Sequence, residues 1–265
     1  MRPPRHLAFP AILRLAAVAL ALSCALPALA RDWTELRIAT EGARPPYNFI
    51  EGESELKGFE IDLANELCAR MKVTCKIVQR EWDNLIPGLL LDHYDAIMAA
   101  MDITDERREQ IEFSEPYVRM PSAFAALRRK QIHSTSPNAL KGRTIGVEDR
   151  SKQKTWLDEN YTKSHIMPYA SLEEAMLDLA NGRIDTLLAD KLPLAEFLRT
   201  RKEAQCCKFL ADVPRDPIVF GEGIGVGLRK EDNDLRELFN KAIEDVVSDG
   251  AYARIRAKYF DFEIF

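Results

Sequence analysis

The positions of apolar residues follow two different periods along the first part of this 265-residue chain. Three short apolar runs have the length of buried strands, and the segments between them carry apolar residues at helical spacing. Phe59, Leu63 and Leu67, for example, lie four residues apart and define one face of a helix. The order strand, helix, strand, helix, strand predicts a βαβαβ unit with a parallel sheet. The segments are, in order, 36–40, 59–71, 75–79, 82–91 and 94–101.

The same alternation begins again in the second half of the chain. A strand of small residues is predicted at 122–127, and after a polar tract three strands alternate with two helices. The second of these helices carries a capping box, Ser171 with Glu174, and Gly182 follows its last residue. We therefore expect a second α/β unit, whose segments are 144–147, 151–161, 165–169, 171–181 and 184–190.

The C-terminal part is predicted to contain two helices, at 234–248 and at 251–260, before an aromatic tail. A run of alternating glycines, 221–227, precedes them. This run lacks the spacings of dinucleotide and Walker loops, so a flexible hinge is favoured over a phosphate-binding loop. The apolar face of the first helix consists of Leu235, Leu238, Phe239, Ala242, Ile243 and Val246.

A charged turn directly follows the strand predicted at 94–101. A buried strand that delivers charge at its carboxyl end is how open α/β sheets build ligand sites. Arg107 is the residue of most interest in this turn, because a guanidinium matches a carboxylate with two parallel hydrogen bonds. A solvated loop with local ion pairs explains the turn equally well, and Asp102 could simply cap the helix that follows.

The N-terminus has the pattern of a secretory signal peptide. Arg2 and Arg5 precede a long apolar run that ends in an A-x-A type cleavage site, which predicts a signal at 1–30 and a mature start near Arg31. The alternatives are a retained membrane anchor, which the interruption by Arg14 disfavours, and a lipoprotein cysteine at Cys24.

Composition and charge narrow the class of partner. The chain is 46% hydrophobic and 30% charged, as in ordinary soluble proteins. Its net charge of −5 becomes −8 without residues 1–30, which hold three arginines and no acid. An acidic surface argues against binding to nucleic acid and against a basic membrane-binding face. The four histidines show no paired spacing, and we expect neither a metal, a cofactor nor an enzyme.

The cysteines leave two questions open. Export permits disulfides, and a bridge between Cys68 and Cys75 would close a short loop between a helix end and the next strand; two free buried thiols are the alternative. Cys206 and Cys207 are adjacent, and a bridge between neighbours is strained. We expect these two to be free thiols, or one exposed and one buried.

Seven motifs in order along the chain resemble a known family. They are GFEIDLANELCARM, WDNLIPGLL, YDAIMAAMDITDERR, IEFSEPY, GRIDTLLAD, GVGLRKED and KYFDF. Over nearly all of residues 36–262 the chain resembles the periplasmic polar amino-acid-binding proteins of ABC importers, in particular the lysine/arginine/ornithine and histidine binders, with opine binders close by.

The resemblance implies a periplasmic binding protein type II-like fold, with two α/β lobes joined by two crossover segments and a ligand cleft between them. Lobe 1 would comprise 31–118 and 224–265, lobe 2 would comprise 123–219, and the hinge would lie near 118–122 and 220–223. It also implies a disulfide at the Cys68/Cys75 pair, as in the basic-amino-acid binders.

The function that the resemblance implies is capture of a polar, cationic L-amino acid by lobe closure and delivery to the membrane permease of an ABC transporter. The protein would be a periplasmic monomer without a cofactor. The alternatives are a binder of opines or acidic amino acids, a dehydratase-type enzyme on the same scaffold, or a ligand sensor for a membrane receptor.

The family's binding residues carry over to twelve positions. Arg107 falls on the clamp for the ligand α-carboxylate and Asp190 on the partner of the α-ammonium. Glu41 matches the acid that meets the far end of basic ligands, and Trp82 matches a stacking aromatic. Ala99 and Ala100 replace serines, so only their backbone groups could contact the ligand. The remaining positions are Arg44, Asp102, Glu148, Ser151, Lys152 and Gln153.

Four of these positions depart from the family pattern. Asp102 stands where a serine or threonine is usual, and beside Asp190 it would strengthen the attraction for an ammonium. Arg44 replaces a stacking tyrosine, Glu148 a leucine and Lys152 a threonine. The two acids Glu41 and Glu148 favour a cationic side chain, whereas the two bases oppose it unless they pair internally with those acids.

Overall fold

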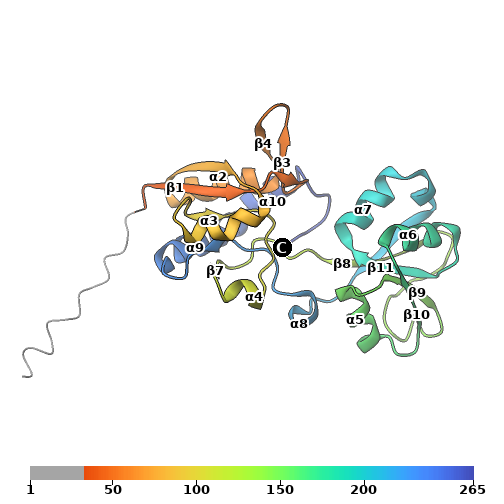
Figure 1. The fold of residues 1–265 in the computed structure, drawn as a ribbon. Coiled ribbons are helices and arrows are strands. Elements are labelled where there is room, and N and C mark those ends of the chain that lie inside the picture. Colours follow the sequence, from red (N-terminus) through yellow and green to blue (C-terminus); the bar gives the residue numbers. More distant parts are fainter. Residues whose placement is uncertain (1–32) are drawn as a thin grey trace, which may run out of the picture. The chain divides into compact units, whose positions relative to one another are not determined.

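Two five-stranded sheets and the helices beside them make up most of the computed structural model (Figure 1). The structure describes residues 33–265, so the predicted signal peptide at 1–30 lies outside the described residues. In the part of the chain that it describes, no helix combines the length and the apolar character needed to cross a membrane.

The first sheet has the strand order β5-β1-β6-β13-β7. β1 runs parallel to both β5 and β6, so the predicted βαβαβ unit is confirmed. β13 is antiparallel to β6 and β7, which makes the sheet mixed. The strands are β1 (Glu35–Thr40), β5 (Thr74–Gln79), β6 (Ala96–Ile97), β7 (Glu112–Phe113) and β13 (Gly227–Leu228).

Helices cover both faces of the first sheet because alternate strand residues point to opposite sides. Ile38 packs in a cluster with Phe59, Leu63 and Leu67, whereas its neighbour Ala39 packs with residues of the opposite face. The helices are α2 (Phe59–Met71), η1 (Trp82–Asn84), α3 (Leu85–Leu90), α4 (Asp105–Arg108), α9 (Asn233–Ser248) and α10 (Ala251–Arg256).

The second sheet has the order β10-β9-β11-β8-β12. β9 is parallel to β10 and β11, and β8 is antiparallel to β11 and β12. The strands are β8 (Ser122–Leu127), β9 (Thr144–Glu148), β10 (His165–Tyr169), β11 (Thr186–Asp190) and β12 (Cys207–Asp212). The helices are α5 (Lys152–Asn160), α6 (Leu172–Asn181), α7 (Lys191–Thr200), η2 (Lys202–Cys206) and α8 (Pro217–Phe220).

Both predicted ends of α6 are confirmed, with Ser171 as the N-terminal cap and Gly182 as the C-terminal cap. The Ser171 hydroxyl accepts a hydrogen bond from the Glu174 backbone N–H at 3.3 Å, and Gly182 ends the helix in the left-handed conformation. β12 and α7 were not predicted from the sequence.

Several predicted segments differ in length from those observed. The helix expected at 82–91 is split into η1 and α3, because Pro87 has no N–H to continue the ladder. Only Ala96–Ile97 pairs as a strand within 94–101, since Ala100 has a φ of +51° and turns the chain. Leu238, predicted on the inner face of α9, is 38% exposed.

A small three-stranded sheet, which the sequence did not predict, stands beside the first sheet. It consists of β2 (Ala43–Arg44), β3 (Asn48–Glu51) and β4 (Glu55–Lys57) in antiparallel order. The two prolines that prevent β1 from continuing lie in the first turn of this small sheet, between β2 and β3. This sheet places Arg44 at a fixed position opposite Asn48.

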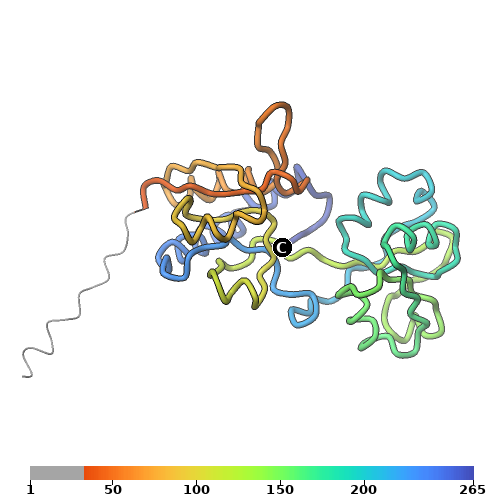
Figure 2. Tube along the Cα trace, in the orientation of Figure 1, coloured from red at the N-terminus to blue at the C-terminus, as the bar shows by residue number. Residues whose placement is uncertain are grey.

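The chain passes from the first sheet to the second along one segment and returns along another (Figure 2). Val118 on the outgoing segment pairs with Ile224 on the returning one in an antiparallel bridge. Gly223 adopts a φ of +121°, and a Cβ there would lie 2.3 Å from the Val118 carbonyl oxygen. Any other residue would therefore push the two segments apart.

Cys68 and Cys75 form a disulfide that joins the end of α2 to β5. The bridge implied by the family resemblance is thus present. Cys206 and Cys207 are free, the former exposed and the latter buried, as predicted.

We expect the double variant Cys68→Ser/Cys75→Ser to lose about 2–3 kcal/mol of unfolding free energy, because the bridge restricts the unfolded chain. Urea denaturation with and without reductant measures this loss. Reductant should destabilise the parent protein and leave the double variant unaffected. Equal stabilities of the oxidised parent and the variant would show that the bridge contributes nothing.

Candidate functional site

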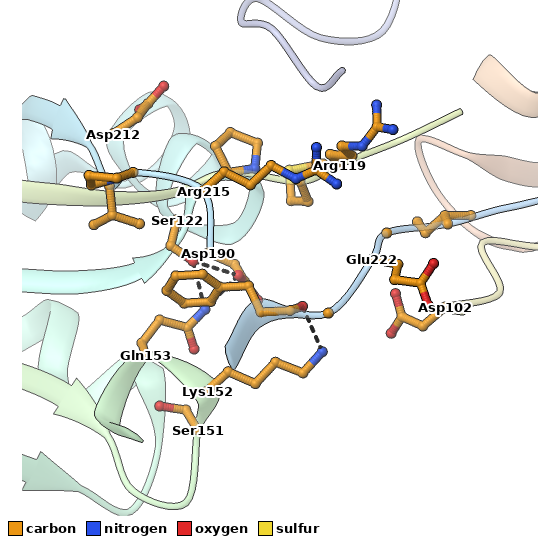
Figure 3. Close-up of a pocket in the computed structure, with 18 of the residues that line it drawn as sticks. Asp102, Arg119, Ser122, Ser151, Lys152, Gln153, Asp190, Asp212, Arg215 and Glu222 are labelled. Atoms are coloured by element: carbon orange, nitrogen blue, oxygen red, sulfur yellow. Dashed lines mark hydrogen bonds between the residues drawn. The ribbon is translucent and has the colours of Figure 1, made fainter. Parts of the chain in front are cut away.

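Asp190 is the last residue of β11, and two side chains hold its carboxylate. Gln153 donates from Nε2 to Oδ1 at 2.6 Å, and the Ser122 hydroxyl donates to the same oxygen at 3.2 Å. Gln153 also donates to the Ser122 hydroxyl at 2.9 Å, which closes the triangle visible in Figure 3. Asp190 is therefore fixed in place by residues from β8 and α5.

The electrostatic surroundings of Asp190 favour a cation beside it. Burial raises the pKa of Asp190, and the negative charge of Asp102 adds to this rise. The donors Ser122 and Gln153 and the positive charge of Lys152 act in the opposite direction on that pKa. A carboxylate whose charged form is disfavoured by desolvation gains stability when an ammonium approaches it.

A pocket of about 880 Å³ lies in front of Asp190. This volume lies in the range of small-molecule sites and exceeds that of one amino acid. Figure 3 shows the Asp102 and Glu222 side chains on the opposite side of the close-up from Asp190. The pocket brings together six of the predicted positions, namely Asp102, Glu148, Ser151, Lys152, Gln153 and Asp190.

The start of α5 shapes one wall of this pocket. The Ser151 hydroxyl caps the helix by accepting from the Lys154 N–H at 3.1 Å, and it donates to the Glu148 carbonyl at 2.6 Å. Lys152 donates from Nζ to the Phe220 carbonyl at 3.1 Å. Lys152 is thus not paired with Glu148 in this structure, contrary to the internal pairing considered from the sequence.

A second group of predicted residues gathers at the first sheet, around the indole of Trp82. The Arg44 guanidinium lies 4.2 Å from the ring centroid and also forms an ion pair with Glu41 at 2.7 Å. The Arg107 guanidinium lies 5.4 Å from the same centroid. These four side chains form a charged cluster on one aromatic platform.

The turn before α4 positions Arg107. Thr104 caps this short helix, since its hydroxyl accepts from the Arg107 backbone N–H at 3.3 Å. The suggestion that Asp102 caps the helix is therefore wrong, because Asp102 lies two residues earlier and pairs with Ile224 instead. The Arg107 guanidinium donates to the Asp102 carbonyl oxygen at 2.6 Å, which holds it close to the pocket residue.

Ala99 and Ala100 lie in the chain between β6 and Asp102. Ala99 is buried, and the Ala100 N–H donates to Glu60 Oε1 at 2.7 Å. This N–H already has a partner within the protein, so it has no free hydrogen to offer a ligand here.

Glu60 is a buried acid in the first turn of α2 that sequence reasoning missed. It accepts hydrogen bonds from the Ala100 N–H, from Asn48 Nδ2 at 2.6 Å and from the Tyr117 hydroxyl. Burial raises the pKa of Glu60, and these three donors lower it. Asn48 in turn accepts from the Gly42 N–H at 2.8 Å. The network therefore ties the loop beside Glu41 to the turn at Ala100.

Ser122 is the other contributor that the sequence did not reveal. It begins a strand of small residues, SAFAAL, where a serine gives no signal that its hydroxyl contacts Asp190. Among residues 33–265, no cluster of three or more metal-ligating side chains could hold a metal ion.

Comparison with known proteins identifies close relatives of this chain. The family described as bacterial extracellular solute-binding proteins, family 3, matches residues 36–262. The histidine-binding periplasmic protein of Salmonella typhimurium is 35% identical over 248 residues, which cover 93% of this chain and 95% of that protein. The L-arginine-binding protein of Pseudomonas aeruginosa is 36% identical over 251 residues, with coverages of 93% and 96%.

A solved structure gives the corresponding likeness in three dimensions. It is a periplasmic His/Glu/Gln/Arg/opine family-binding protein from Silicibacter pomeroyi in complex with lysine, 32% identical and with a TM-score of 0.52. The match covers 87% of this chain and all of that one. The predicted fold is confirmed as the type II fold with two α/β lobes. These relatives are named as binding proteins, so the role is solute binding and not catalysis.

Proposed function

We propose that this chain, which belongs to family 3 of the bacterial extracellular solute-binding proteins, captures an L-amino acid with a cationic side chain and delivers it to an ABC permease. The observation that carries the proposal is the fixed carboxylate of Asp190, which faces a pocket and would gain from an ammonium partner. The names of the relatives, which include histidine and arginine binders, support the ligand class.

The ligand would be held as a zwitterion. Arg107 would clamp the α-carboxylate with its fork of donors, and Asp190 would take the α-ammonium. The side chain would extend toward Trp82 and Glu41 on one side and Glu148 on the other. Asp102, Ser151, Lys152 and Gln153 would complete the contacts, and Asp102 would add to the attraction for the ammonium.

Lobe closure follows from the positions of the two partners in the chain. Arg107 belongs to the proposed lobe 1 (31–118 and 224–265) and Asp190 to the proposed lobe 2 (123–219). A ligand that bridges both residues binds the closed state more tightly than the open state, and therefore shifts the equilibrium toward closure. The movement would be absorbed near 118–122 and 220–223, where the paired segments at Val118 and Ile224 meet.

The proposed setting is the periplasm. Residues 1–30 would direct export and be removed, which leaves a mature protein that begins near Arg31 and acts as a monomer. The disulfide between Cys68 and Cys75 agrees with an oxidising compartment. Mass spectrometry of the exported protein tests the cleavage point, and gel filtration tests the monomer.

A thermal-shift screen of the common amino acids with ornithine, octopine and nopaline tests the ligand class. We expect the largest rise in melting temperature with arginine, lysine, ornithine or histidine, because a ligand stabilises only the state that binds it. A dominant response to glutamate or aspartate would show that Arg44 and Lys152 face the ligand side chain, which contradicts the cationic assignment.

A further inference from the structure

Arg44 occupies the place where the cationic side chain of a ligand is proposed to bind. Its guanidinium lies over the Trp82 ring at 4.2 Å and pairs with the Glu41 carboxylate at 2.7 Å. An aromatic face and a carboxylate are the two groups that recognise a ligand guanidinium or ammonium. We propose that Arg44 is an internal competitor that weakens binding of cationic side chains and thereby sets the selectivity of the site; this inference rests on the proposed function.

The backbone of Arg44 is held firmly, whereas its side chain is free to leave. Residue 44 pairs with Asn48 across the β2–β3 turn, and its carbonyl oxygen accepts from the Tyr47 N–H at 2.8 Å. The Arg44 side chain is 44% exposed, and that of Glu41 is 18% exposed. The Arg44 backbone therefore stays beside the Trp82 ring, and its guanidinium can move into solvent when a ligand displaces it.

The other charges around Trp82 make it unfavourable for Arg44 and a ligand cation to lie on the same ring. Arg107 already lies 5.4 Å from the Trp82 centroid, so a ligand cation would be the third positive charge on one ring. The cluster contains one carboxylate, that of Glu41, and the Arg44 guanidinium already donates a hydrogen bond to it. A ligand cation therefore either displaces Arg44 or accepts the repulsion of a like charge, and both raise its dissociation constant.

The size of this penalty follows from the two interactions that displacement breaks. An exposed ion pair and a cation–π contact together correspond to about a tenfold change in affinity. A neutral side chain such as that of glutamine has no need of Glu41 and can lie beside Arg44 without charge repulsion. Selectivity for cations over neutral side chains is therefore lower with Arg44 present than without it.

Calorimetric titration of Arg44→Ala with arginine, lysine, glutamine and glutamate tests the inference. We expect about tenfold tighter binding of arginine and lysine than in the parent protein, and less than about a threefold change for glutamine. The matched control is Lys57→Ala, which removes one positive charge from the same small sheet, where Lys57 pairs with Glu55 at 2.6 Å. It should leave all four affinities unchanged.

The possible results separate the inference from the proposed function. Unchanged or weaker binding of arginine by Arg44→Ala would overturn the inference while cationic binding by the parent protein still stands. A selective loss of glutamate affinity in Arg44→Ala would also overturn it, because Arg44 would then be a ligand for an acid. If the parent protein and Arg44→Ala bind no cationic amino acid at all, the proposed function itself fails.

Discussion

Replacing Asp190 with alanine is expected to abolish micromolar binding of amino acids while the protein stays folded, and Arg107→Ala should have the same effect. In the proposed closed complex, each change would remove the protein partner of one ligand charge from a site that excludes water. Truncations of this kind cost about 2–5 kcal/mol, or roughly 30- to several-thousand-fold in affinity. Isothermal titration calorimetry measures the loss, and circular dichroism melting curves establish that the variants are folded.

Two further variants make this experiment specific to the charge of Asp190. Asp190→Asn preserves the shape and the contact with Ser122 but removes the charge, so it should lose most of the affinity as well. Asp212→Ala is the matched control, because Asp212 lines the same pocket but pairs with Lys191 at 2.7 Å. Nearly unchanged titrations for both Asp190→Ala and Arg107→Ala would rule out the zwitterion clamp.

The sequence predicts the fold well wherever apolar spacing alone decides the structure. α2 begins and ends at Phe59 and Met71 as expected, since its apolar face lies in the local sequence, whereas the left-handed cap at Lys72 has no local signal because this conformation favours glycine. The strand around Ala96 is shorter than the apolar run that contains it. The residues that follow it, in the turn toward Ala100, are apolar because they are buried and do not pair as a strand. Local spacing does not distinguish these two reasons for an apolar run.

The residues of the candidate site are also only partly predictable from the sequence. Asp190 and Arg107 are visible in the sequence as charges that follow predicted strands, and the family resemblance assigns them roles. Their partners are not visible, because Ser122 and Gln153 meet Asp190 only through the pairing of β8 with β11 and the packing of α5. Likewise, nothing local shows that Arg44 reaches Trp82, which lies 38 residues further along the chain.

Glu60 shows most clearly what the sequence conceals. An acid in the first turn of a helix is usually solvated and helps to stabilise the helix N-terminus. Glu60 is fully buried instead, and each of its three partners is a donor. Tyr117, one of these donors, precedes the segment that pairs with Ile224, so the network joins both ligand-side loops to the connection between the sheets.

The variant Glu60→Gln should therefore lose about 3 kcal/mol of unfolding free energy, although it is nearly isosteric. The amide oxygen can accept from Ala100 and Tyr117, but the new NH₂ group then faces the Asn48 NH₂ group. Rotation of the Asn48 amide relieves that contact only by turning its NH₂ group toward the Gly42 N–H. In either arrangement, one N–H donor faces another N–H donor and neither has an acceptor there.

A second variant, Asn48→Asp, tests whether the hydrogen bond between residues 48 and 60 causes this loss. Alone it places two carboxylates in buried contact and should destabilise the protein by a similar amount. Combined with Glu60→Gln it restores the pattern, because one oxygen accepts from the Gly42 N–H and the other accepts from the new amide. Urea denaturation of both single variants and the double variant measures the coupling between the sites. If the two losses simply add, Glu60 and Asn48 do not act as one network; recovery of stability in the double variant would show that the two side chains stabilise the fold as one buried network.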